Sequence, residues 1–509
     1  MASDNRASSR VTLSGVRDAY FRGEFERVLG MVDALPQRDA VDIVETELLR
    51  TRALVALDRA EEALRVLRGL RLTERPRDEY LTAQMLTGAA YVRLGQTRRA
   101  ADVLTEAWEA ATSAHRTVRA EIALQLGIAH MRERRYDEAR ARLESVPHDA
   151  DIVHAQAVEY LGWTAFARGV YGEAADLFNN ALAAISECRH YDRFVEARTL
   201  YGLATLVAEL PRPERWPDLR ARIAAFDWSA SGLRVPRFWL AIAASFVTEM
   251  LGDRAEAERW ASDAEEFAPG DAQRIVALCR IAAVLGRYGE SAGHAHFVRR
   301  ARRLYECLKR NDAFRAERSL PLALAEEIVA GAEPRDAEPL AIYYDEALAP
   351  AVRQGHESEM LAALRHSVEA GIEAGRGNRA KAARLYGRAF AQYERIGYGR
   401  RASIVAFRLA ELTGEARCAE YAGAALRGAS DSYWVKAAFA RLGARGVRLG
   451  ERHLAILRLV AEGKTNKEIA AARGISPLTA RNAVRELLRR FGATNRTELG
   501  QLARDRGVV

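Results

Sequence analysis

The chain has 509 residues, a formal net charge of +8, four cysteines and 49% hydrophobic residues. This length exceeds what one hydrophobic core usually serves, so we expect several domains or an array of repeats. The cysteines are far apart and form no CxxC pair, which argues against a disulfide framework and against a zinc site. The sequence contains no run of about 18 apolar residues that would predict a membrane span, and the N-terminal segment MASDNRASSR lacks the apolar core of a signal peptide. We therefore expect a cytoplasmic protein that has no membrane partner.

Residues 10 to about 430 show helical periodicity almost throughout, and no segment has a convincing strand pattern. Three segments repeat one arrangement of small and apolar residues at spacings of 35 to 39 residues. Small residues at the eighth and twentieth positions predict a close crossing of two paired helices, and positions 24 and 27 are expected to pack on the next unit. The units contain Gly88, Tyr91, Gly95, Ala100, Leu104 and Ala107; Gly127, His130, Ala139, Leu143 and Val146; and Gly162, Ala165, Gly169, Ala174, Phe178 and Ala181.

This pattern resembles the tetratricopeptide repeat. Weaker copies lie near Ala63, after Gly252, after Gly377 and after Gly414, and the register is least distinct between 265 and 365. Such units stack into a superhelix whose concave face binds peptides or proteins. We therefore predict a helical-repeat sensing or interaction domain over 1–430, with a peptide, protein or small-molecule effector in its groove. The alternative is an array that serves only as a scaffold or a dimerisation arm.

Two proline-rich segments, 210–217 and 331–339, predict irregular connections. Residues 431–446 predict a last helix with Trp434 and Phe439 on its apolar side. Gly443 and Gly446 then predict a flexible joint, so 431–448 is expected to separate two domains.

The segment 449–502 predicts four short amphipathic helices. Glycines end the first two, and short polar residues begin the later ones. Thr465 with Glu468, and Asn495 with Glu498, are expected to form capping boxes. The predicted helices are Glu451–Glu462, Asn466–Arg473, Pro477 to about Phe491 with Ser476 as N-cap, and one that follows Asn495. A short helix, a glycine turn and a longer helix are typical of a helix-turn-helix.

The third of these helices has an apolar side and a basic side. Ala480, Val484, Leu487, Leu488 and Phe491 are expected to pack inward. On the other side lie Arg481, Asn482, Arg485 and Arg489. Arginine suits guanine O6 and N7, and asparagine suits adenine N6 and N7, so this side predicts contact with double-stranded DNA. A solvated arginine face is the plainer interpretation, but the capped turn before it favours DNA binding.

The segment resembles the LuxR/GerE-type helix-turn-helix of bacterial transcription regulators. The residues that match are Leu449, Arg452, Leu457, residues 462–470, Ile475, Ser476, Thr479, residues 489–492, Arg496, Glu498 and Leu499. The resemblance implies base contacts by Arg481, Asn482 and Arg485. It implies contacts with the DNA backbone by Lys467, Thr479, Arg489 and Arg496. It also implies a homodimer whose contact involves Leu499, Leu502 and Ala503.

Two residues depart from the family pattern. Ala483 stands where the family often has His, and His453 stands where it usually has Glu. The first departure weakens the expected packing at the groove, and the second loosens the expected pairing within the first helix.

The basic surplus is concentrated in the predicted DNA-binding domain, 449–509. This segment has 12 Lys and Arg against 6 Asp and Glu, whereas the rest of the chain has 65 against 63. Such a distribution suits a surface that faces phosphates. It argues against the alternative function, a protein-interaction scaffold whose last helices only cap the array.

We expect no enzyme, no cofactor and no metal site. Lys464 and Thr465 follow Gly463 as in a phosphate loop, but Arg458 occupies the position of the first required glycine. His294 and His296 are alternate residues of a helix and point apart. The sequence therefore predicts an all-helical bacterial transcription regulator.

Overall fold

In the computed structural model the described residues are 11–35, 40–70, 77–210, 215–288, 290–308, 359–415, 451–491 and 493–505, with the single positions 341, 418, 421 and 422. Within these ranges all regular structure is helical, which confirms the all-α prediction. None of the helices in the described part of the chain is long and apolar enough to cross a membrane.

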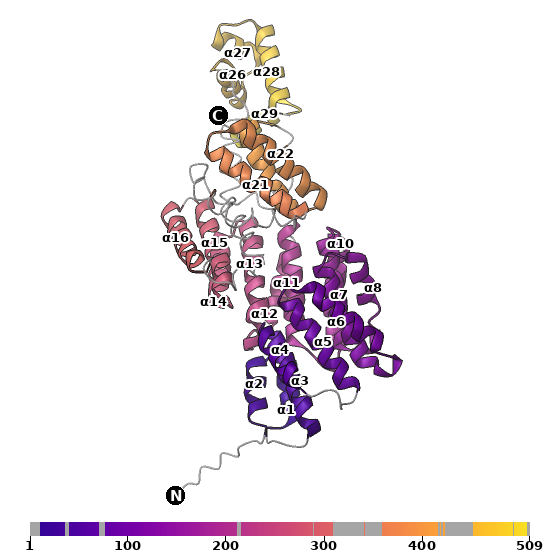
Figure 1. Ribbon diagram of the computed structural model, residues 1–509. Helices are drawn as coiled ribbons and strands as arrows, with labels where there is room; N and C mark the ends of the chain where they lie inside the picture. Colours follow the sequence, from indigo (N-terminus) through magenta and orange to yellow (C-terminus); the bar gives the residue numbers. More distant parts are fainter. Residues whose placement is uncertain are drawn as a thin grey trace.

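The N-terminal array consists of antiparallel helix pairs that follow one another along the chain (Figure 1). Its helices are α1 (Leu13–Phe21), α2 (Phe25–Asp33), α3 (Ala40–Ala56), α4 (Ala60–Gly69), α5 (Arg77–Arg93), α6 (Thr97–Ala110), α7 (Arg116–Arg132), α8 (Tyr136–Glu144), α9 (Ile152–Ala167), α10 (Tyr171–Glu187), α11 (Arg193–Glu209), α12 (Trp216–Ala225), α13 (Arg234–Met250), α14 (Arg254–Phe267), α15 (Asp271–Arg287), α16 (Ser291–Leu308), α21 (Glu359–Gly375), α22 (Arg379–Ile396) and α23 (Gly399–Thr413). Short 3-10 turns precede three of them: η1 (Ser113–His115), η2 (His148–Ala150) and η4 (Ser231–Leu233).

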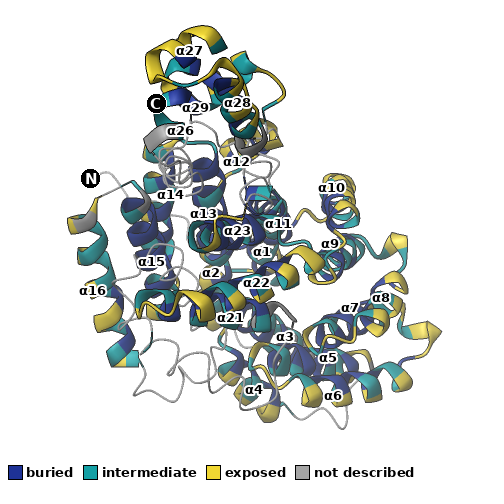
Figure 2. Ribbon diagram, turned by 90° about the horizontal axis from the view of Figure 1, so that it is seen from above, coloured by how far each residue is buried: buried dark blue, intermediate teal, exposed yellow. Residues whose placement is uncertain are grey.

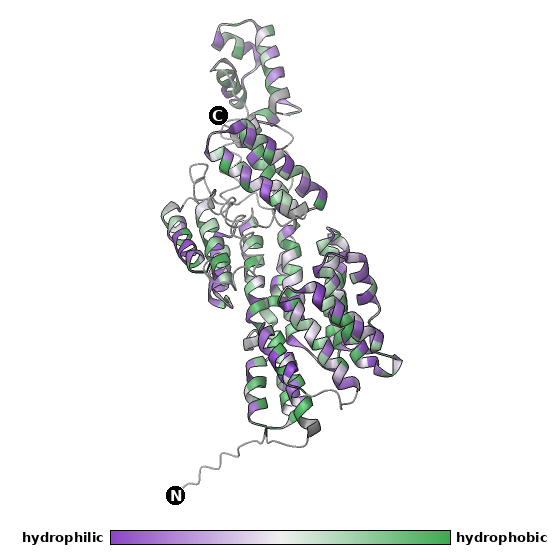
Figure 3. Cartoon of the chain, viewed as in Figure 1, coloured by the Kyte–Doolittle hydropathy of each residue, from purple (hydrophilic) through white to green (hydrophobic). Residues whose placement is uncertain are grey.

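The pairs form because apolar residues recur at helical spacing and a residue of the connecting turn takes a left-handed conformation. This residue is a glycine in several pairs, but it is Asp58 between α3 and α4 and Arg134 between α7 and α8. Gly95 and Gly169, at position 15 of their units, have φ angles of 70° and 79°. This left-handed conformation favours glycine because it has no Cβ. Hydrophobic and hydrophilic residues are interspersed along the helices, as Figure 3 shows. Outer helices such as α6 and α10 bury one side against their neighbours, whereas α7 and α13 are buried over most of their circumference.

The close crossing within a pair joins position 8 to position 24. A Cβ on Gly88 would lie 2.4 Å from Cγ of Leu104, and one on Gly162 would lie 2.9 Å from the Phe178 ring. Phe178 also fills the space at Gly202 of the next pair, where a Cβ would lie 2.8 Å away. At Phe178, position 24 therefore packs on the next unit, as expected, and its side chain also packs within its own unit.

The first helix pair meets α11 and η4. The rings of Phe25 and Phe194 lie 5.6 Å apart, edge to face. The amide of Gly232 donates to the carbonyl oxygen of Gly23 at 3.2 Å. A core cluster that includes Phe25, Phe194 and Leu233 lies at this contact, which we call the seam. The inner helices α1, α3, α5, α7, α9 and α11 consequently surround a common interior.

The pair α22 and α23 packs on the middle of the array, as Figure 1 shows for α22 above α11 and α13. The Tyr171 hydroxyl donates to the carbonyl oxygen of Ile396 at 3.2 Å. Arg400 and Glu209 form a buried ion pair at 3.2 Å, although 191 residues separate them. Burial raises the pKa of Glu209, but the charges of Arg400 and Arg401 outweigh it and hold that pKa below its usual range.

Phe246 of α13 lies between two guanidinium groups. The Cζ atoms of Arg280 and Arg400 are each 4.0 Å from its ring centroid. Each arginine has its own carboxylate, since Arg280 donates to Glu249 at 2.5 Å in the same way that Arg400 pairs with Glu209. We call these five side chains the Phe246 clasp. It joins α11, α13, α15 and α23 through buried charges.

Several predicted features lie outside the described residues. These are the segment 331–339, most of the last weak repeat after Gly414, and the predicted helix and joint at 431–448. The segment 210–217 is partly described, and Pro217 stands in the first turn of α12. In the section with the least distinct register, α14, α15 and α16 continue the paired arrangement.

Candidate functional site

The four C-terminal helices have one shared core. They are α26 (Glu451–Ala461), α27 (Asn466–Arg473), α28 (Pro477–Phe491) and α29 (Arg496–Asp505), close to the bounds predicted from the sequence. The buried residues of this core are Ile456, Leu457, Val460, Ile469, Ala470, Ala480, Val484, Leu487, Leu499 and Ala503. The inward side predicted for α28 is confirmed at Ala480, Val484 and Leu487.

Local hydrogen bonds fix the start of α27 and the turn between α27 and α28. The amide of Thr465 donates to the Glu468 carboxylate at 2.7 Å, and the amide of Glu468 donates to the Thr465 hydroxyl at 3.3 Å. This confirms the predicted capping box, and the bond from Thr465 holds the pKa of Glu468 below its usual range. Gly474 ends α27 with a φ angle of 62°. Ser476 then caps α28 by accepting from the amide of Thr479 at 3.1 Å.

The second predicted capping box differs in one partner. Asn495 accepts from the amide of Glu498 at 2.9 Å, as expected. The Glu498 carboxylate, however, accepts from the amide of Thr494 at 2.7 Å rather than from Asn495. Arg496, which follows Asn495 in the chain, donates to the side chain of Asn466 at 2.8 Å and to the carbonyl of Lys464. Its side chain thus ties α29 to the start of α27.

The predicted base-contacting residues lie together on one side of α28. Arg481, Asn482 and Arg485 are all exposed, and they lie opposite the buried side chains of the same helix. Lys467 on α27 is exposed as well, and Figure 2 shows how much of α27 faces solvent. Thr479 is half-buried beside the Ser476 cap. The side chain of Arg489 lies outside the described residues.

The residues predicted for dimerisation lie on α29. Leu499 and Ala503 are fully buried in the core of their own domain, and Leu502 is half-buried against it. Leu499 and Ala503 thus stabilise the four-helix domain, and Leu502 is the one of the three with accessible surface.

These features agree with a comparison against known families. Residues 447–503 match the model described as bacterial regulatory proteins, luxR family. The C-terminal domain is a LuxR-family helix-turn-helix. It is 41% identical over 58 residues to YvfU, an uncharacterized transcriptional regulatory protein of Bacillus subtilis (strain 168). That match covers 11% of this chain and 29% of the regulator.

Two solved structures are similar in fold to about three quarters of the chain. One is a Rap protein complexed with competence and sporulation factor, at 12% identity and a TM-score of 0.43, covering 75% of this chain and 99% of that one. The other is the apo form of RapI, at 13% identity and a TM-score of 0.45, covering 70% and 99%.

A second candidate site is the interior of the array. A cavity of about 840 Å³ lies between α1, α3, α5, α7, α9 and α11. Ion pairs that join different helices stand in its wall. Arg52 donates to Glu121 at 2.6 Å, and both line the cavity. Arg198 also lines it and pairs with Glu159, which is fully buried behind the wall. The Tyr160 ring lies 4.8 Å from the Arg198 guanidinium carbon.

These charged residues were not among those predicted from the sequence to be functional. Their signal is a charged residue within an otherwise apolar inner helix, such as Glu159 in α9, whose partner Arg198 follows 39 residues later. That separation equals one repeat, so the repeat register places both side chains on adjacent inner helices.

Asp192 lies at the cavity wall and caps α11. Its carboxylate accepts from the amides of Phe194 at 2.8 Å and Val195 at 3.3 Å. Burial nevertheless raises the pKa of Asp192 to about 6. The group therefore exchanges its proton close to neutral pH.

We expect this carboxyl to make stability depend on pH. Because its pKa is raised in the fold, the folded chain binds a proton that the unfolded chain releases, and stability falls as the pH rises from about 4 to 6. The loss is up to about 3 kcal/mol. Asp192→Asn keeps an oxygen that accepts from the cap amides and has no proton to lose. Urea unfolding at pH 4.5 and at pH 7 measures the free energy of unfolding. This free energy should be lower at pH 7 than at pH 4.5 in the parent chain, and the difference should be smaller in the variant. Equal differences in the two chains would contradict the assignment.

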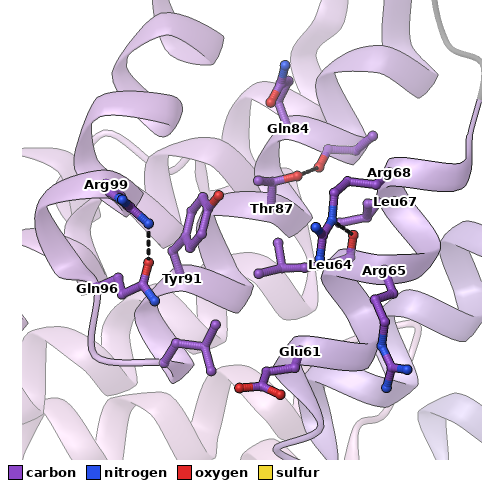
Figure 4. Close-up of a pocket in the computed structure, with 12 residues that line it drawn as sticks. Glu61, Leu64, Arg65, Leu67, Arg68, Gln84, Thr87, Tyr91, Gln96 and Arg99 are labelled. Atoms are coloured by element: carbon purple, nitrogen blue, oxygen red, sulfur yellow. Dashed lines mark hydrogen bonds between the residues drawn. The ribbon is translucent and has the colours of Figure 1, made fainter. Parts of the chain in front are cut away.

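A smaller hollow of about 560 Å³ lies between α4, α5 and the turn into α6 (Figure 4). Two of its arginines have local partners, since Arg68 donates to the Leu64 carbonyl at 3.1 Å and Arg99 to Gln96 at 3.0 Å. Among the described residues no group of three His, Cys, Asp or Glu could hold a metal ion. His294 instead hydrogen-bonds the carbonyl of Ala282 at 2.8 Å.

Proposed function

We propose that the chain is a sequence-specific DNA-binding transcription regulator. The observation that carries this function is the exposed row Arg481, Asn482 and Arg485 on α28, opposite the core of a LuxR-type domain. With α28 in the major groove, these side chains contact base edges. Lys467, Thr479 and Arg489 contact the DNA backbone and set the position of α28.

Arg496 differs from the other residues proposed to contact the DNA backbone, because its side chain also has a structural role. Its guanidinium is committed to Asn466 and to the Lys464 carbonyl, beside Lys467. Any phosphate contact of Arg496 therefore adds to a structural role, and its removal would weaken both the fold of the domain and DNA binding.

We propose further that the cavity of the array binds an effector, which is a peptide, a protein segment or a small molecule. A volume of about 840 Å³ suits this role, because ligand pockets are usually about 300–1,000 Å³. Acidic and basic side chains occur in equal number along its wall, which favours a ligand with both kinds of charge. These are Arg17, Arg52, Arg93, Arg132 and Arg198, with Glu45, Asp58, Glu121, Asp151 and Asp192.

The proposed link between effector and DNA is the pair α22 and α23. This pair packs on α11 through Glu209 and Arg400, and α11 also lines the cavity. An effector can change DNA binding only if its affinity differs between two arrangements of the chain, and such coupling is usually about 1–3 kcal/mol.

We also propose that the regulator binds as a homodimer to two half-sites. Of the residues predicted to form the contact, Leu502 has accessible surface on α29, and the exposed Gln501 lies beside it. Leu499 and Ala503 support that surface from inside the domain.

Selection of bound duplexes from a random library by the full-length chain tests the function. Enriched sequences, bound with an affinity that falls as salt rises, are the expected result. A chain that enriches no sequence and binds no duplex at low salt would instead be the interaction scaffold.

Arg481→Ala is expected to weaken binding to the selected site by about 1–3 kcal/mol and to reduce discrimination at one base pair. Lys467→Ala is the matched comparison, because it should weaken all duplexes alike and reduce the salt slope by about one unit. Titrations of the selected site and of single-base variants, at several salt concentrations, separate the two effects. Unchanged sequence preference in Arg481→Ala would show that this side of α28 does not contact bases.

A further inference from the structure

Leu478, the second residue of α28, presents an apolar side chain to solvent. Its exposed fraction is 65%, the highest among the large hydrophobic residues of the described ranges. The other four are 41–49% exposed, and all of them lie on the array. Single exposed leucines are common on protein surfaces, so its exposure becomes informative only through its position on the helix.

Around the axis of α28, Leu478 points in the same direction as the residues of the proposed DNA-contacting side. Counted from it, Arg481, Asn482 and Arg485 stand at i+3, i+4 and i+7, which are neighbours on one side of a helix. The buried residues Ala480, Val484 and Leu487 lie on the opposite side. Leu478 is thus flanked by the two arginines and the asparagine and points away from the core.

The start of α28 is held in place by its neighbours. The Ser476 hydroxyl accepts from the amide of Thr479 at 3.1 Å, and Pro477 begins the helix with a fixed φ angle. In a helix-turn-helix the N-terminal residues of the second helix contact base edges. Leu478 is consequently in a rigid part of the helix that lies at the groove.

We propose that Leu478 contacts the C5-methyl group of a thymine in the major groove. This inference rests on the proposed function, since it requires α28 to lie in that groove. Leucine has no donor or acceptor, so the one feature of a base edge that it can recognise is the methyl group, which thymine presents and cytosine does not. The contact removes apolar surface of both partners from water. It adds a preference for thymine next to the bases that Arg481 and Asn482 contact.

The test uses the full-length chain and its selected duplex. Each thymine of the site is replaced singly by deoxyuridine, which removes the methyl group and leaves the hydrogen-bonding edges unchanged. At one thymine of each half-site the replacement is expected to weaken binding of the parent chain about fourfold, the factor that corresponds to one methylene-sized group. Leu478→Ala is expected to weaken binding to the thymine duplex by a similar factor and to bind both duplexes equally. Val170→Ala, which removes an exposed apolar side chain from the array, should leave both affinities unchanged.

The outcomes separate this inference from the proposed function. If Leu478→Ala remains sensitive to deoxyuridine at every thymine to which the parent chain is sensitive, Leu478 contacts no methyl group and the inference is wrong. The same holds if Leu478→Ala binds the site as tightly as the parent chain, and its surface would then suit a protein contact. If Arg481→Ala and Arg485→Ala also keep full affinity and preference, α28 does not lie in the groove and the proposed function fails with it.

Discussion

Arg400→Ala is expected to lower the free energy of unfolding by about 3–5 kcal/mol, because it leaves the Glu209 carboxylate buried without its main counter-charge. Both side chains are buried, at 5% exposed for Arg400 and 8% for Glu209. The substitution also removes one of the two guanidinium groups that cover the Phe246 ring in the Phe246 clasp. The structural effect should be concentrated where α23 packs on α11. Hydrogen exchange should therefore rise in α22 and α23 more than in α5 to α8.

A surface arginine with a carboxylate partner provides the control for this prediction. Arg135 pairs with Glu138 at 3.0 Å with about half of each side chain exposed, so Arg135→Ala should change stability by less than about 1 kcal/mol. A double variant, Arg400→Met with Glu209→Leu, should recover much of the loss because it removes both charges of this buried pair together. Equal effects of Arg400→Ala and Arg135→Ala would show that the buried pair does not hold α23 to the array.

Phe178→Ala should cost about 3–5 kcal/mol, the usual range for loss of a buried phenylalanine. The ring is fully buried and lies against both Gly162 of its own unit and Gly202 of the next. Its removal thus opens a cavity at two consecutive helix crossings, and α9, α10 and α11 should lose cooperativity together. Urea unfolding of the parent and variant chains, with hydrogen exchange to locate the change, measures both effects.

Two glycines of the same helix pair provide a matched control. Gly162→Ala places a methyl group 2.9 Å from the Phe178 ring and should destabilise the pair. Gly172→Ala meets no atom within 4 Å, and it should be neutral or slightly stabilising because alanine favours helices. If the two substitutions had the same effect, the crossing would be looser than the distances indicate.

The elements fixed by local signals could be predicted closely from the sequence. The bounds of α27 and α28, the Thr465–Glu468 capping box and the glycine turns of the repeats follow from residues within one turn of one another. Such signals do not depend on how the chain is folded elsewhere. The exposure of Arg481, Asn482 and Arg485 follows in the same way from the period of one helix.

Features that join distant segments could not be predicted from the sequence. The Arg400–Glu209 pair spans 191 residues, and no pattern in the sequence relates its members. The residues that line the cavity depend on which inner helices face one another. The repeat period alone does not give this, because it also depends on the curvature of the superhelix. Arg496 and Leu499 match family positions, but the structure shows that their side chains also serve the domain itself.

The seam has a mechanical consequence for any effector. An open solenoid is elastic: its superhelix can widen or narrow by small rotations between neighbouring units, because each unit contacts only its neighbours. The contacts of α2 with η4 and with Phe194 of α11 close one turn of the superhelix into a ring. An effector too large for the proposed cavity must therefore separate Phe25 from Phe194 before it can bind. The array then opens at the seam in one step. Its conformational response to effector size therefore has a threshold, whereas an open solenoid would change shape gradually.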